Sequence, residues 1–274
     1  MSTTSRIAAA LSLDSLGPDA RAAFDLAADA GFAGIAIPTN HPQLAPADFG
    51  DSARRHFKKT LEHRHLSIDS IRIAAPRQGL ADAATIDRTL ANARAAITLA
   101  HALGVRTVSL YTGGLSNVPN PQATGALSST NAALSMDTIA AATRLLASEA
   151  DKAGITLALS SDSPTRLQEL LNLLAAPHLR ANLEPASLLA AGDDPVAIAA
   201  ALGNRIGQFT AADAIKAGRQ LRAVELDQGQ VPLADLFLQL KAQHFMGPTV
   251  VDLRDLPNTP QAAYRAAEVL RRVM

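Results

Sequence analysis

Eight short apolar runs alternate with longer amphipathic stretches along the 274-residue chain. The runs predict buried β-strands, because short apolar segments bounded by turn residues are typical of strands covered on both faces. They fall at Arg6–Leu11, Gly34–Ile37, Ile68–Ile73, Thr107–Tyr111, Thr156–Leu159, Leu179–Leu183, Arg205–Phe209 and Thr249–Leu253. This alternation predicts parallel strands joined by right-handed helical crossovers.

The intervening stretches predict helices by their apolar spacing and their end signals. Gly31, Gly104 and Gly154 stop three of them, since glycine adopts the left-handed conformation that ends a helix. The predicted helices are Pro18–Ala30, Ser52–His65, Asp82–Leu103, Met136–Ala153, one beginning at Pro164, Pro195–Leu202, Val231–Gln243 and Pro260–Val273. A Pro/Ser/Asn/Gly-rich segment, Leu115–Leu134, predicts a long loop, for which closure over a pocket stays an open alternative.

Neither a linker nor a break in composition interrupts this pattern. The sequence therefore predicts an α/β protein with a single (β/α)8 TIM barrel domain spanning residues 1–274. In such barrels the chemistry lies at the carboxyl ends of the strands, so that end is where a site is expected.

Composition narrows the classes of function. Formal net charge is zero, with 25 basic and 25 acidic residues, which disfavours nucleic-acid binding because that requires a basic face. Cysteine is absent, which excludes thiolate metal sites and a cysteine nucleophile. We expect neither a membrane span nor a signal peptide, and a cytoplasmic location is the default expectation.

Polar side chains at the predicted strand ends are the candidates for chemistry. Among the 7 histidines only His41 follows a strand on the expected face. Side chains alternate along a strand, so Asn182 and Glu184 share a face, as do Gln208 and Thr210. Arg72 points opposite to Ile71 and Ile73, and therefore toward the barrel axis if the isoleucines face the helices. A charge there needs a partner, for which Glu184 and Asp252 are candidates.

Several short motifs, in a fixed order, resemble the xylose isomerase-like family of sugar isomerases and epimerases. They are AGFAGI at 30–35, LGVRTV at 103–108, AGITLAL at 153–159, ANLEPASLL at 181–189, RI through ADA at 205–214, QGQV at 228–231 and GPTVVD at 247–252. Their order and spacing, rather than any one motif, carry the resemblance. It implies a TIM barrel that acts on or binds a small polyhydroxylated ligand, a sugar or sugar acid. Dimers and tetramers are common among the relatives, so a homo-oligomer is one expectation.

Family members typically hold one divalent metal with side chains from strands five to eight. The resemblance places those ligand positions at Ser160, Glu184, Thr210 and Asp252, and the family's glutamate in strand two at Ala36. Two carboxylates and two hydroxyls make a poor site for a hard cation. Two alternatives remain: no metal, or one divalent ion (Mn²⁺, Mg²⁺, Zn²⁺ or Co²⁺) on Glu184 and Asp252.

Three functional hypotheses follow. In the first, Glu184 and Asp252 are the surviving acid/base pair of an isomerase or epimerase, and His41, Arg72, Asn182, Gln208 and Arg254 contact the ligand. Arg72 supplies the positive charge in place of the metal. In the second, the barrel is a non-catalytic carbohydrate-binding or scaffold protein. The third, an endonuclease acting at abasic DNA sites, needs a zinc cluster and a basic groove and is disfavoured by the charge balance.

Overall fold

The computed structural model describes residues 6–46, 49–75, 79–113, 134–218 and 220–274. Within these residues eight strands close into a barrel in the order β1-β10-β7-β6-β5-β4-β3-β2, and each neighbouring pair is parallel. The strands are β1 (Ile7–Ser12), β2 (Phe32–Pro38), β3 (Ser67–Arg72), β4 (Thr107–Tyr111), β5 (Thr156–Ser160), β6 (Leu179–Leu183), β7 (Ile206–Ala211) and β10 (Thr249–Val251). The predicted (β/α)8 barrel is thus confirmed. The loop predicted at 115–134 lies outside the described residues except for Leu134.

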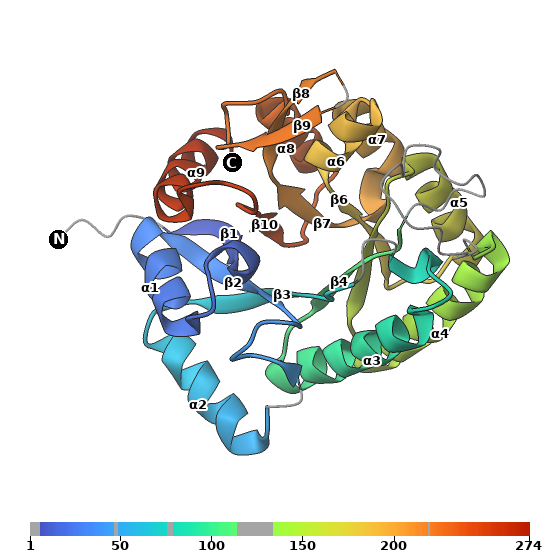
Figure 1. Cartoon of the computed structure of the whole chain (residues 1–274), viewed down its shortest axis with the longest axis horizontal. Coiled ribbons are helices and arrows are strands. Elements are labelled where there is room, and N and C mark those ends of the chain that lie inside the picture. The colour runs from blue at the N-terminus through green and yellow to red at the C-terminus, as the bar shows by residue number, and fades with distance from the viewer. Residues whose placement is uncertain (1–5, 47–48, 76–78, 114–133, 219) are drawn as a thin grey trace.

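Helices surround the strands as a ring (Figure 1). They are α1 (Ala20–Ala30), α2 (Asp51–Glu62), α3 (Ile86–Leu103), α4 (Met136–Ala153), α5 (Pro164–Leu174), α6 (Pro185–Ala191), α7 (Pro195–Leu202), α8 (Leu233–Ala242) and α9 (Thr259–Val273), with 3-10 turns η1 (Leu13–Ser15), η3 (Gly79–Ala81) and η4 (Gly203–Arg205). The three predicted glycine stops are confirmed. Gly31, Gly104 and Gly154 have φ values of 95°, 78° and 68°, in the left-handed region.

Several element boundaries shift by one to four residues from the prediction, and two of these shifts have a local cause or bear on the site. Helix α3 begins at Ile86 rather than at Asp82, because the Asp82 carboxylate accepts hydrogen bonds from the Ala84 amide and the Thr85 hydroxyl, both at 2.9 Å. Those bonds hold a turn ahead of the helix. Strand β10 ends at Val251, so Asp252 follows the strand instead of lying inside it. This places the Asp252 carboxylate at the carboxyl end of the barrel.

An antiparallel hairpin after β7 was not predicted. Its strands are β8 (Asp213–Ala217) and β9 (Gln220–Val224), and Gly218 lies in the connection with φ of 61°. The buried Asp213 carboxylate accepts hydrogen bonds from the backbone N–H groups of Ala214, Gly229 and Val231 at 2.8 to 3.0 Å. These bonds fasten the start of the hairpin to the segment that leads into α8.

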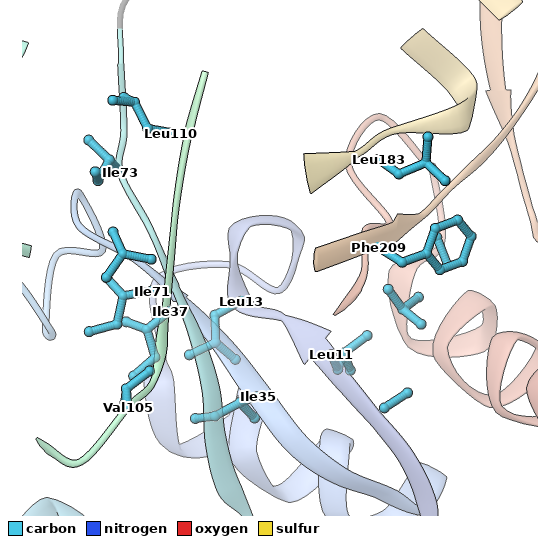
Figure 2. Packing of buried hydrophobic residues seen from close by; sticks show 14 of the residues in the cluster. Leu11, Leu13, Ile35, Ile37, Ile71, Ile73, Val105, Leu110, Leu183 and Phe209 are labelled. Atoms are coloured by element: carbon cyan, nitrogen blue, oxygen red, sulfur yellow. The ribbon is translucent and has the colours of Figure 1, made fainter. Parts of the chain in front are cut away.

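The core has two parts. A large cluster lies between the strands and the helices, and Figure 2 shows Leu11, Ile35 and Phe209 among its buried side chains. A separate cluster of Ala10, Ala36 and Val250 comes from β1, β2 and β10, which neighbour one another in the barrel. The two alanines leave room around the axis, where bulky branched residues are usual in these barrels. Polar side chains fill the space next to them.

Within the described residues no single helix is long and apolar enough to cross a membrane; α6 and the segment Pro195–Arg205 reach the required length and composition only as a pair bent by 118°.

Candidate functional site

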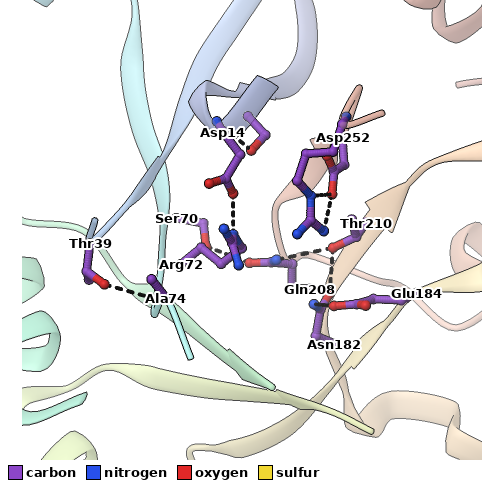
Figure 3. A network of polar contacts seen from close by, with 12 residues as sticks. Asp14, Thr39, Ser70, Arg72, Ala74, Asn182, Glu184, Gln208, Thr210 and Asp252 are labelled. Atoms are coloured by element: carbon purple, nitrogen blue, oxygen red, sulfur yellow. Dashed lines mark hydrogen bonds and ion pairs between the residues drawn. The ribbon is translucent and has the colours of Figure 1, made fainter. Parts of the chain in front are cut away.

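A chain of hydrogen bonds crosses the barrel near the carboxyl ends of the strands (Figure 3). Ser70 of β3 donates to Gln208 Oε1 at 2.6 Å, and Gln208 Nε2 reaches Thr210 Oγ1 at 3.4 Å. Thr210 in turn donates to Asn182 Oδ1 at 2.9 Å, and Asn182 Nδ2 donates to Glu184 Oε1 at 2.7 Å. Asn182 bonds to Glu184 and Gln208 to Thr210, as expected because the side chains of each pair lie on the same face of the chain. Ser70 was not among the predicted site residues, although its parity matches that of Arg72.

Glu184, at the start of α6, is the acidic end of this chain. Burial raises the pKa of its carboxyl, and the nearby Asp252 charge acts in the same direction. A hydrogen bond from Ser160 and the charges of Arg254 and Arg72 lower it, but burial is the largest effect. The residue therefore holds its proton to a higher pH than an exposed glutamate, which is the property required of a general acid or base near neutral pH.

Arg72 lies at the end of β3 and forms an ion pair with Asp14. The prediction that its partner is Glu184 or Asp252 is therefore wrong. Asp14 follows β1 at the same end of the barrel, and its side chain is only 8% exposed. The signal that could have identified it is its place in the turn that follows the first predicted strand, because the carboxyl ends of all the parallel strands meet at one end of the barrel.

Asp252 and Arg254 form a second anchored pair. Arg254 Nη2 and Nε lie 2.5 and 2.7 Å from Asp252 Oδ2, and the Arg254 backbone N–H donates to Oδ1 at 3.0 Å. Both carboxylate oxygens of Asp252 are thus engaged. Burial acts to lower the pKa of the Arg254 guanidinium, but the Asp252 carboxylate, with the charges of Asp14 and Glu184, outweighs it and raises that pKa above its already high value, so this residue stays charged.

His41 lies apart from this group. It is buried, its Nδ1 accepts the Gln43 backbone N–H at 3.3 Å, and burial lowers its pKa, against the smaller raising effects of the Gly17 backbone and the Asp14 charge. It does not appear among the described residues that line the clefts at the carboxyl end. Arg254 lines both clefts and Asn182 lines one of them, whereas Gln208 lines neither and belongs to the hydrogen-bond chain.

Two clefts open at this end of the barrel. The first, of about 370 Å³, is lined by Arg72, Ile73, Ala75, Ser109, Leu110, Tyr111, Ser160, Asp162, Asn182, Glu184, Ser187 and Arg254. The second, of about 500 Å³, extends toward the β8–β9 hairpin. Glu184, Ser187 and Arg254 line both, so the two clefts meet at the Glu184 carboxyl. A larger depression of about 810 Å³ lies at the amino ends of the strands, where Ala8, Ala33 and Gly207 leave the barrel unfilled.

The donor set does not fit a divalent metal ion. At the four positions that the resemblance assigns to metal ligands, Thr210 donates to Asn182, Glu184 accepts from Asn182, and Asp252 is held by Arg254. The fourth position, Ser160, offers only a hydroxyl. In the part of the chain that the structure describes, no three His, Cys, Asp or Glu side chains come together as a metal would require.

The closed parallel barrel, with a polar cleft at the carboxyl ends of its strands, makes this protein a TIM barrel. The family model described as xylose isomerase-like TIM barrel matches residues 24–273. The chain belongs to this family, as its motifs indicate. No curated protein sequence matches it significantly.

Solved structures agree with this assignment at the level of the fold. A xylose isomerase domain protein from Planctomyces limnophilus has a TM-score of 0.76 at 17% identity, covering 98% of this chain and 95% of that one. A xylose isomerase-like TIM barrel protein from Mycobacterium smegmatis, in complex with magnesium, has a TM-score of 0.75 at 16% identity, with coverages of 97% and 95%. The 3-keto-D-glucoside 4-epimerase from E. coli has a TM-score of 0.75 at 14% identity, with coverages of 97% and 100%.

Proposed function

We propose that this chain binds a small polyhydroxylated ligand, a sugar or sugar acid, in the cleft at the carboxyl ends of its strands, and that Glu184 exchanges a proton with it without a metal ion. The observation that carries the proposal is the position of Glu184. Its carboxyl lies where the two clefts meet, and burial raises its pKa. Sugar epimerases are found among the similar structures, which supports the ligand class.

The proposed chemistry is removal or return of a proton on the carbon next to a ligand carbonyl. Glu184 is the acid or base, and the guanidinium groups of Arg72 and Arg254 stabilise the negative charge that develops on the ligand oxygen. Both groups are charged and line the same cleft. Asp252 contributes by holding Arg254 in place, since both of its carboxylate oxygens are occupied.

The test is incorporation of deuterium from D2O into a panel of C4 to C6 aldoses, ketoses and sugar acids, followed by NMR with EDTA present. We expect incorporation by the wild-type chain and a loss of about 100-fold or more in Glu184→Gln, the usual contribution of one acid/base group. Incorporation that stops with EDTA and returns with Mn²⁺, Mg²⁺, Zn²⁺ or Co²⁺ would refute the metal-independent step.

A second candidate is a binding barrel without catalysis. It is favoured by the hydrogen-bond chain, which occupies Thr210 and Asn182 as well as one oxygen of Glu184. This candidate predicts that a sugar or sugar acid raises the melting temperature, because ligands of the native state stabilise it, while no deuterium enters the ligand.

A further inference from the structure

Two arginines line the 370 Å³ cleft, one from the end of β3 and one from the segment after β10, and each is paired with its own carboxylate. Arg72 is paired with Asp14, whose side chain is 8% exposed, and Arg254 with Asp252, whose side chain is 9% exposed. The two pairs come from β3 with η1 and from the segment after β10. Glu184 lines the same cleft as both arginines, whose charges lower its pKa against the larger raising effect of burial.

Anchoring leaves part of each guanidinium for a ligand. The paired nitrogens within the described residues are the Nε of Arg72 and the Nε and Nη2 of Arg254. Each guanidinium carries five N–H donors in a fixed plane, so an outward edge remains on both. Because the side chains are already held, a ligand that binds these edges loses less conformational entropy than one that must order a free arginine.

The acceptors of the cleft, in contrast, are largely used within the protein. Asn182 Oδ1 accepts from Thr210, and Glu184 Oε1 accepts from Asn182. Both oxygens of Asp252 accept from Arg254. Apart from the exposed Asp162 carboxylate and the hydroxyls of the lining, which can accept as well as donate, what remains for a ligand is the N–H groups of the two arginines. A neutral sugar hydroxyl needs to donate as well as accept, whereas a carboxylate only accepts.

The charges permit an anion here. Asp14 and Asp252 are each compensated by their own arginine. Glu184 retains its proton to a raised pH because burial raises its pKa, so it repels an anion less than an exposed glutamate would. Asp162, exposed at the rim, is the one carboxylate lining this cleft that has no partner among the described residues. It provides a natural control.

We propose that the ligand of this cleft carries a carboxylate, and that the outward edges of Arg72 and Arg254 bind it, so that this chain is specific for sugar acids over neutral sugars. Charge-assisted, planar recognition by arginine is suited to a carboxylate. The cleft volume of about 370 Å³ is within the range of small-ligand pockets. This proposal rests on the proposed function, whose site and ligand class it narrows.

The experiment is calorimetric titration of the full chain with a panel of C4 to C6 aldonates and uronates. Each is matched to the neutral alditol or aldose of the same configuration, as D-gluconate is to D-glucitol and D-glucuronate to D-glucose. We expect at least tenfold tighter binding of the acids, and weaker acid binding in 0.5 M NaCl than in 0.05 M, because salt screens the attraction. Equal or tighter binding of the neutral partners overturns the proposal and leaves the proposed function standing. Binding of neither half of the panel overturns both.

Two variants locate the interaction. Arg254→Lys keeps the charge but loses the planar fork, and should weaken acid binding at least tenfold. Asp162→Asn removes the rim charge, leaves the anchored pairs intact, and should tighten acid binding two- to fivefold without affecting the neutral partners. Since Asp162 is exposed, this variant should fold normally. If both variants bind the acids as the wild type does, the arginine assignment is wrong.

Discussion

Replacing Thr210 with valine is the sharpest test of the hydrogen-bond chain. Valine keeps the shape of threonine and removes the hydroxyl. In the structure that hydroxyl donates to Asn182 Oδ1 at 2.9 Å and accepts from Gln208 Nε2 at 3.4 Å. Both amides are buried, with 6% and 2% of their surface exposed, so water cannot readily replace the lost partner.

The magnitude follows from these two contacts. A buried polar group left without its partner costs about 1–3 kcal/mol. The 2.9 Å bond should account for most of the loss and the 3.4 Å contact for little, because hydrogen bonds weaken with distance. We expect Thr210→Val to lower the free energy of unfolding by about 2 kcal/mol.

The control is Thr89 in α3, which is fully buried and whose hydroxyl has no hydrogen-bond partner among the described residues. Thr89→Val removes a hydroxyl that gains nothing by being buried, and should leave stability unchanged or raise it. Both variants are compared with wild type by urea denaturation, and their m-values should match that of the wild type. If Thr210→Val is as stable as Thr89→Val, the chain of bonds does not hold the barrel end together and the reasoning fails.

Two further outcomes are expected. The folded chain keeps the Glu184 proton to a higher pH than the unfolded chain, because burial raises that pKa above the ordinary 4.5. The free energy of unfolding should therefore fall as pH rises from that ordinary value through the raised pKa, by about 1.4 kcal/mol for each unit of the shift. Glu184→Gln, which cannot ionise, should gain stability relative to wild type across the same window, whereas Glu268→Gln, at an exposed side chain with no ion pair among the described residues, should not show this gain in a urea series over pH. A side chain at Gly247 would place its Cβ 2.2 Å from the Gly207 carbonyl oxygen, so Gly247→Ala should destabilise the chain by about 1–3 kcal/mol, as overpacking does. Gly50→Ala meets no atom within 4 Å and should cost less in the same denaturation assay, an equal loss arguing against the steric explanation.

Periodicity predicted the barrel because each apolar run had to be a strand covered on both faces. The glycine stops predicted helix ends for the same local reason, and Gly31, Gly104 and Gly154 all adopt the left-handed conformation. The β8–β9 hairpin was missed although its segment alternates around Gly218. In a chain of βα units, the connection after a strand is expected to be a helix, so the alternating pattern of residues 213–224 was not interpreted as a pair of strands.

The site was predicted only where strand parity decides it. Parity placed Arg72 toward the axis and paired Asn182 with Glu184, as observed. Parity could not identify the partner of Arg72. The carboxylates of Asp14, Glu184 and Asp252 all lie at the same end of the barrel, and spacing along the sequence does not give distances across it. Asp14 is the partner, from the turn after β1. Similarly, the bond between Arg254 and Asp252, two residues apart, depends on the conformations of their side chains, which strand parity does not determine.

The direction of the hydrogen-bond chain bears on where Glu184 can carry its proton. Thr210 donates to Asn182, which fixes the amide oxygen of Asn182 toward Thr210 and its N–H toward Glu184 Oε1. An oxygen that accepts an amide hydrogen is a poor position for a proton, so the proton of the acid form lies on Oε2. The hydroxyl of Ser187, which lines both clefts, donates to that oxygen at 3.4 Å and has to rotate into the accepting orientation when Oε2 carries the proton. A chain built from neutral groups thereby favours a proton on the Glu184 oxygen beside Ser187, a residue that lines both clefts, and this preference depends on the same Thr210 hydroxyl whose removal tests the stability of the barrel end.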